Sequence, residues 1–115
     1  MNAERKEAYI EEKRKNATVF ANFELIMNLA APLEEEYGRD ICEWSENEIV
    51  RLYKYYSTTS YTHLVQLNCT LTNYTDWCLD NGLVRDGINH FRNVSTETLV
   101  SCIDLYRLRR NSIRP

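Results

Sequence analysis

The residues best suited to chemistry are basic and hydroxyl side chains in the second half of the chain. Arg51 and Lys54 are spaced to share one face of a helix, and four consecutive hydroxyl residues follow at 57–60. Hydroxyl groups and free backbone N–H groups at the start of a helix bind phosphate oxygens. Nearby cations add attraction to a polyanion. This pattern therefore predicts contact with the phosphates of a nucleic acid.

The charge of the chain is distributed unevenly along its length. Residues 1–48 hold 6 Lys and Arg against 12 Asp and Glu, whereas residues 49–115 hold 8 against 5. Such a chain can present a basic face to DNA despite its net charge of −3. The alternative for each cation is an ordinary solvated charge, because arginine near a helix C-terminus also suits the helix dipole. The predicted DNA-binding residues are Arg51, Lys54, Ser57, Thr58, Thr59, Ser60, His63, Arg85, His90, Arg92, Arg107, Arg109 and Arg110.

Catalytic, metal and cofactor sites have no sequence signature here. The chain contains neither of the glycine-rich motifs that cradle phosphates of nucleotides. Its four cysteines form no Cys-x-x-Cys pair, and its two histidines have no metal-ligand spacing relative to them. A Cys78–His63 catalytic pair would span four helical turns. We therefore expect buried free thiols, no metal, no cofactor, no small-molecule substrate and no enzymatic activity of this chain alone.

Two further stretches bear on the environment of the protein. The longest relevant uncharged stretch, residues 25–33, is too short to cross a membrane, and the charged first residues lack the apolar segment of a secretory signal. We expect a soluble, cytoplasmic protein with no membrane partner. The three glutamates at 34–36 point three ways round a helix, so a solvated face is expected there rather than a cation site.

The spacing of apolar residues predicts helices throughout, and the low content of 3 Gly and 2 Pro agrees with that. The charged stretch 3–15 is predicted to be a solvated helix or a frayed arm, anchored only by Tyr9 and Ile10. A helix follows over 17–37, where Pro32 should kink or restart it and Gly38 should end it. Ser45 and Glu48 have the spacing of a capping box, which predicts a helix over 46–56.

The strongest helical period lies in the middle of the chain. Apolar residues from 64 to 78 recur at steps of 3, 4, 3 and 4, which predicts a helix over 60–81 that ends at Asn81 and Gly82. Residues 83–93 are predicted to be an irregular connector. Ser95 then caps a last helix that continues to Tyr106. Because no stretch alternates like a strand, we expect an all-α bundle of four to five helices.

Four stretches also carry a family resemblance. The hydroxyl-rich turn and helix start at 57–64, the segment 71–78 with Trp77, the Asn-Gly-Leu-Val at 81–84 and the stretch 88–91 resemble the N-terminal core-binding domain of tyrosine recombinases. This is the SAM-like helical domain of phage integrases. Asn89 is followed by His90, where the family pattern has proline. The resemblance covers roughly residues 17–105.

The resemblance implies a fold and a role together. Such domains form one half of a clamp around double-stranded DNA, and a C-terminal recombinase-like domain forms the other half. The catalytic arginines, histidines and nucleophilic tyrosine belong to that second half and map nowhere on this chain, so Tyr106 is not read as a nucleophile. Some relatives are phage repressors that do not recombine DNA. The expected function is therefore DNA binding without catalysis, in an integrase module or a transcriptional repressor.

The expected organisation has three parts. Residues 1–16 form a charged helix or arm, residues 17–106 the core-binding-like domain, and residues 107–115 a basic tail or the start of a linker to a C-terminal domain. Whether the chain is a fragment or a stand-alone derivative stays open. The alternative function is a protein-interaction module that regulates a DNA-binding partner. In that case residues 3–15 and Tyr55 would contact the partner, for example by covering its basic surface.

Overall fold

The computed structural model describes residues 2–13 and 17–104, and within these ranges it contains helices and no strand. These are five α-helices and two short 3₁₀ helices. Of the 3₁₀ helices, η1 lies between α2 and α3, and η2 lies between α4 and α5. In chain order the elements are α1 (Ala3–Glu12), α2 (Ala17–Tyr37), η1 (Ile41–Glu43), α3 (Glu46–Tyr56), α4 (Tyr61–Asp80), η2 (His90–Asn93) and α5 (Thr96–Ser101). The predicted all-α bundle is confirmed. None of the described helices combines the length and apolar character that crossing a bilayer requires.

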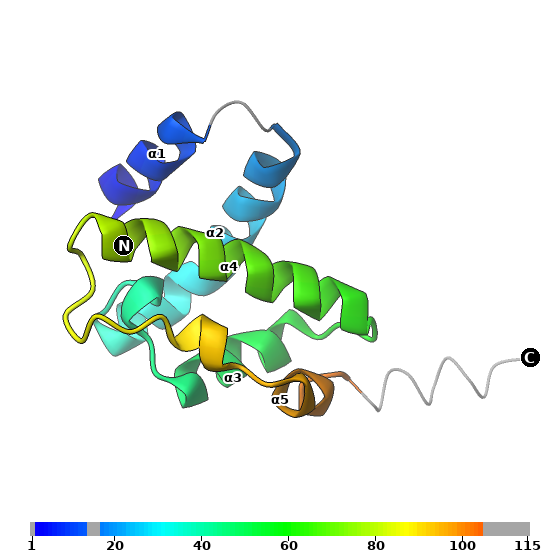
Figure 1. Ribbon diagram of the computed structural model, residues 1–115. Helices are drawn as coiled ribbons and strands as arrows, with labels where there is room; N and C mark the ends of the chain where they lie inside the picture. Colours follow the sequence, from blue (N-terminus) through cyan, green and yellow to red (C-terminus); the bar gives the residue numbers. More distant parts are fainter. Residues whose placement is uncertain (1, 14–16, 105–115) are drawn as a thin grey trace, which may run out of the picture.

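Helix α4 is the central element of the bundle. It contacts α2, η1, η2 and α5. Figure 1 shows α1 above the C-terminal part of α4, with α3 and α5 below its N-terminal part. The side of α4 that faces these neighbours carries the predicted apolar stripe, Leu64, Leu67, Leu71, Tyr74 and Cys78, and all five side chains are buried. The period of 3.6 residues thus identified both the helix and its buried face.

The predicted helix starts are confirmed by their caps. The backbone N–H of Ser45 donates to Glu48 Oε1 over 2.8 Å, which completes the capping box at the start of α3. Ser60 accepts the His63 N–H at the start of α4, and Ser95 accepts the Thr98 N–H at the start of α5. Helix α5 ends at Ser101, earlier than predicted.

Helix α2 runs through Pro32 as one helix instead of restarting there. Pro32 is exposed and lacks an N–H, so the backbone carbonyl four residues earlier loses its helical donor on the solvent side. The helix ends at Tyr37, and Gly38 follows with a φ of 67°. Its N–H donates to the Glu34 carbonyl over 2.8 Å. Gly38 is therefore the C-terminal stop that the sequence predicts.

Helix α1 is packed against the bundle more closely than its charged sequence suggests. Tyr9 is only 3% exposed and lies in an aromatic cluster with Phe23, Tyr74 and Trp77. The ring centroids of these three residues lie 5.0 to 5.5 Å from that of Tyr9. Edge-to-face contacts at this distance stabilise aromatic pairs beyond the area they bury. One face of α1 is therefore part of the core, and only its other face is solvated.

Candidate nucleic-acid interface

Part of the predicted DNA-binding set lies where α3 ends and α4 begins. Lys54 is exposed in the last turn of α3, and His63 is exposed in the first turn of α4. The first turn of α4 contains no acidic residue, unlike those of α1, α3 and α5. The positive end of the α4 dipole is therefore not neutralised by its own side chains. This junction combines an accessible cation with a helix start that lacks acidic side chains.

Three of the four hydroxyl residues in the junction, Ser57, Thr58 and Ser60, are directed to partners inside the chain. Ser57 Oγ donates to Asp104 Oδ2 over 2.7 Å, and the Thr58 carbonyl accepts the Asp104 N–H over 2.9 Å. Thr58 is buried, and its hydroxyl oxygen accepts the Ser60 N–H over 3.1 Å. These bonds hold the turn in shape. Thr59 is half-buried, and Ser60, also half-buried, caps α4 by accepting the His63 N–H.

Several predicted cations are paired with acidic side chains of the same surface. Arg51 binds Glu36, donates to Tyr37 Oη over 3.2 Å and lies over the Tyr37 ring. Arg92 binds Asp76. The Arg92 hydrogen bond holds the pKa of Asp76 below its ordinary value, and the Glu36 hydrogen bond raises the pKa of Arg51. Exposed pairs of this kind are weak, so a stronger polyanion can compete for the cation.

His90 and Arg85 lie in the connector after α4 rather than at the α3–α4 junction. Nε2 of His90 is 2.8 Å from an Asp86 carboxylate oxygen, and this contact lowers the pKa of Asp86. Arg85 is exposed and lines a hollow of about 180 Å³ together with Arg39, Glu43 and Asp86. Figure 1 shows the loop 81–89 at the opposite end of α4 from the junction. Arg107, Arg109 and Arg110 lie outside the described residues.

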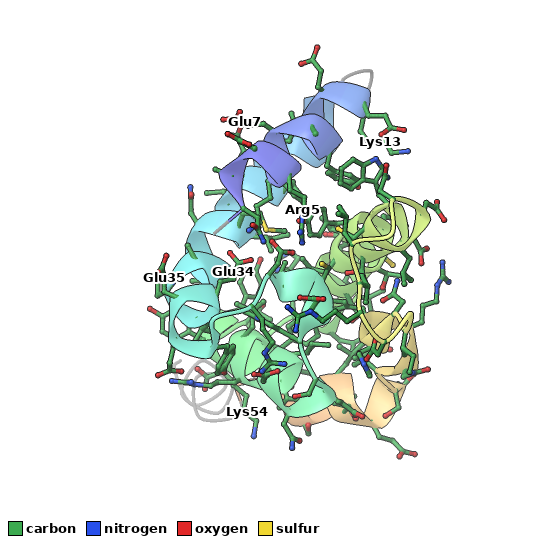
Figure 2. The ribbon with its side chains drawn as sticks, turned by 90° about the vertical axis from the view of Figure 1, so that its left-hand side faces the viewer. Arg5, Glu7, Lys13, Glu34, Glu35 and Lys54 are labelled. Atoms are coloured by element: carbon green, nitrogen blue, oxygen red, sulfur yellow. The ribbon has the colours of Figure 1, made fainter. Side chains whose placement is uncertain are left out.

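A buried ionic cluster is the feature that sequence reasoning missed. Lys6 Nζ lies 2.8 and 2.7 Å from the two carboxylate oxygens of Glu34 and 3.2 Å from Asp40 Oδ1. Glu34 Oε2 also accepts the Ile41 N–H over 2.9 Å. Both carboxylates are almost fully buried. The expectation that residues 34–36 are solvated is therefore wrong for Glu34, and Figure 2 shows Glu34 turned inward beside the outward Glu35.

The partners of Asp40 extend this cluster to α4. Asp40 Oδ2 accepts the Cys42 N–H and the Tyr74 hydroxyl, each over 3.1 Å. Burial pushes the pKa of Asp40 upward, but Lys6, the Cys42 N–H and Arg5 together bring it below its ordinary value. For Glu34, burial dominates and raises the pKa, while Lys6 opposes the rise. The cluster thus joins α1, α2, η1 and α4 through ion pairs and hydrogen bonds.

One sequence signal pointed to this cluster. Glu34 occurs four residues after Ala30, on the same helical face as the buried Phe23 and Met27. A glutamate on an apolar stripe needs a buried partner, because an unpaired carboxylate is costly to desolvate. The partner, Lys6, lies on another helix and 28 residues away. Helical periodicity alone does not identify such a partner.

The comparisons with known proteins agree with the fold and with the resemblance. Residues 1–80 match the family described as MrpR, N-terminal core-binding domain. This is a SAM-like core-binding domain of the recombinase and integrase type, and core-binding domains are DNA-binding modules. The match includes α1 through α4. No curated protein matches the chain significantly. With most of its length matched in this way, the chain belongs to the family of the MrpR N-terminal core-binding domain.

Proposed function

We propose that this chain binds double-stranded DNA, without catalysis, as the core-binding module of a tyrosine-recombinase-like phage protein, either an integrase or a transcriptional repressor. The observation that carries the proposal is the family match over residues 1–80. A C-terminal recombinase-like domain would then supply the other half of a clamp. Such a protein would act in the cytoplasm of the bacterial host, at the nucleoid.

The α3–α4 junction is the surface that we propose for the phosphate contacts. A phosphate placed before α4 would accept from the unpaired N–H groups of its first turn and meet the positive end of its dipole. Lys54 on one side and His63 on the other are exposed and able to approach the same strand. Phosphate contacts fix position, so any sequence preference would come from other side chains of α3 or from the connector.

Two exposed ion pairs set the conditions for binding, one beside the junction and one between η2 and the C-terminal part of α4. Arg51 would exchange Glu36 for a phosphate, and Arg92 would exchange Asp76. Both pairs lie at the surface, where an ion pair contributes little stability and is screened by salt. We therefore expect modest affinity from this module alone, with a strong dependence on ionic strength.

The test is a salt-dependent titration of a fluorescently labelled duplex of about 30 base pairs, followed by anisotropy, because each neutralised phosphate contributes about 0.9 to the slope. Binding that weakens steeply with salt is expected. Replacement of Arg51, Lys54 and Arg85 by alanine should flatten the slope. The matched control is Lys13→Ala, which removes an exposed cation from α1, far from Lys54 in Figure 2. Absence of binding at low salt would refute DNA binding by this chain alone.

A second candidate function is supported by the exposed acidic residues of the first two helices. Exposed glutamates gather on α1 and α2, where Glu4, Glu7, Glu24 and Glu35 are all solvent-accessible. Tyr55 on α3 is 64% exposed as well. These features would suit a protein-interaction module that covers the basic surface of a DNA-binding partner. In the titration above, such a module would leave the duplex unbound at every salt concentration.

A further inference from the structure

Cys42 and Cys78 are 36 positions apart in the chain and meet in the core. Cys42 lies in η1, and Cys78 lies in the last turn of α4. Their sulfur atoms and a carboxylate oxygen of Asp40 all lie within 4.8 Å of one another. The two thiols also share a hydrogen bond. They therefore form a dithiol pair that joins two elements of the bundle.

The groups around this pair act differently on its two thiols. Arg5 Nη1 donates to Cys42 Sγ over 3.5 Å and lies 3.7 Å from Asp40 Oδ2. Figure 2 shows Arg5 pointing inward from α1 toward this sulfur-containing region. The hydrogen bond from Cys42, together with the charge of Arg5, lowers the pKa of Cys78 against its burial and the nearby Asp40 carboxylate. The same hydrogen bond, burial and Asp40 raise the pKa of Cys42. A thiolate is the nucleophilic form of cysteine, so Cys78 is the thiol prepared for attack.

The same charges disfavour a metal ion at this place. Asp40, Cys42 and Cys78 could supply three ligand atoms, but Arg5 lies against two of these residues. Lys6 Nζ is also 3.2 Å from Asp40 Oδ1. Two cations in contact with the ligand set oppose a third positive charge and suit a pair of thiols that can ionise.

We propose that Cys42 and Cys78 form an intrachain disulfide when the protein meets a hydroperoxide. In the first step the Cys78 thiol loses its proton, and its sulfur attacks one peroxide oxygen. The O–O bond breaks, Cys78 becomes a sulfenic acid, and the leaving oxygen takes the proton. In the second step Cys42 loses its proton and attacks the Cys78 sulfur. The S–S bond forms, the S–O bond breaks, and water leaves. Two thiols are oxidised by two electrons, and hydrogen peroxide is reduced to two waters.

The geometry requires only local adjustment. A disulfide bond is about 2.05 Å long, so the two sulfur atoms approach by at most about 2.8 Å from their present separation. Cys42 is the middle residue of the three-residue 3₁₀ helix η1, and its N–H is held by the Asp40 side chain, so the adjustment falls mainly on the two cysteine side chains. Both thiols are buried, and Arg5 of α1 lies against Cys42. Entry of the hydroperoxide therefore follows local opening of this N-terminal helix.

The experiment uses a Cys69→Ser/Cys102→Ser background, which keeps this pair and removes the other two thiols. The folded protein is treated with hydrogen peroxide, then unfolded, alkylated with N-ethylmaleimide and weighed by mass spectrometry. We expect a monomer that is about 2 Da lighter than the reduced chain, takes up no maleimide and recovers both alkylation sites after dithiothreitol. A digest should contain a peptide that links residues 42 and 78.

Two further variants complete the test. In the same background, Cys42→Ser and Cys78→Ser should each abolish the loss of about 2 Da, and circular dichroism checks that each variant is folded. The proposal is overturned if the folded parent still takes up two maleimides. It is also overturned if peroxide adds about 16 or 32 Da without cross-linking, or if linked dimers dominate. Because mass is the readout, the outcome is independent of whether the chain binds DNA.

Discussion

At the scale of single residues, the buried charges around Lys6 bear on the stability of the fold. Lys6 is the cation shared by Glu34 and Asp40, and all three are nearly inaccessible to water. A buried pair of this kind adds little stability over an apolar core, but removal of one partner leaves a desolvated charge behind. The presence of Lys6 therefore adds little stability, but its removal would leave two buried carboxylates without their shared cation.

Lys6→Met should lower the free energy of unfolding by about 3–5 kcal/mol at pH 7, because two buried carboxylates lose their shared cation. Urea denaturation measures the change. The matched control is Lys13→Met, an exposed lysine at the C-terminal end of the same helix, which should change stability by less than about 0.5 kcal/mol. A loss below about 1 kcal/mol in Lys6→Met would contradict the charge balance described here.

The pH dependence of the stability of Lys6→Met provides a second check. In the wild type the pKa of Asp40 is lowered, so its contribution to stability is complete above the ordinary value of 3.8 and is lost as the pH falls below it. In Lys6→Met the carboxylates bind protons more readily than in the unfolded chain. Acidification should therefore stabilise the variant relative to the wild type. The difference between their free energies of unfolding should shrink between pH 7 and pH 4.

At the scale of elements, α1 shows where the sequence is informative and where it is not. The stripe on α4 and the cap of α3 depend on neighbours within one helix, so periodicity and local motifs predict both. The docking of α1 depends on Tyr9 meeting Tyr74 and Trp77, which are distant in sequence. Tyr9 and Ile10 are enough to dock α1 because the surface that receives the helix is aromatic. A single sequence does not reveal that surface.

Tyr9→Ala should detach α1 without unfolding the bundle, because it removes the centre of the aromatic cluster. We expect the thiols of Cys42 and Cys78 to react with a disulfide reagent at least about tenfold faster, which corresponds to about 1.4 kcal/mol in the opening equilibrium. The rate is measured in the Cys69→Ser/Cys102→Ser background. Ile10→Ala, which truncates a half-buried neighbour, should have a smaller effect. Equal rates in Tyr9→Ala and the parent would show that α1 does not control access.

At the scale of the whole molecule, the acidic character of the first part of the chain reaches the surface. The excess of acid in residues 1–48 becomes an exposed acidic surface on α1 and α2, as the sequence indicates. The sequence does not indicate that Arg51 and Arg92 meet Glu36 and Asp76, because those pairs join positions 15 and 16 residues apart. Counting cations along the chain therefore overstates the charge that is available to a polyanion.

Glu36→Gln should strengthen DNA binding, because it frees Arg51 for a phosphate. The slope of the logarithm of the binding constant against that of the salt concentration should steepen by about 0.9. Anisotropy at several salt concentrations measures both changes. Glu35→Gln is the matched control, since it makes the same change of charge at an exposed neighbour. If both variants gain equally, net charge explains the result and Arg51 does not contact DNA.

The packing of the two tryptophans has a practical consequence. Trp77 lies against Tyr9, and its indole N–H donates to Glu12, so both of these partners belong to α1. Trp44 is buried against Tyr37 and donates to the Arg39 carbonyl, away from α1. Movement of α1 should therefore change the emission of one tryptophan and leave the other as an internal standard. In a Trp44→Phe variant, the intrinsic fluorescence of the protein would follow its N-terminal helix in real time, with no attached dye.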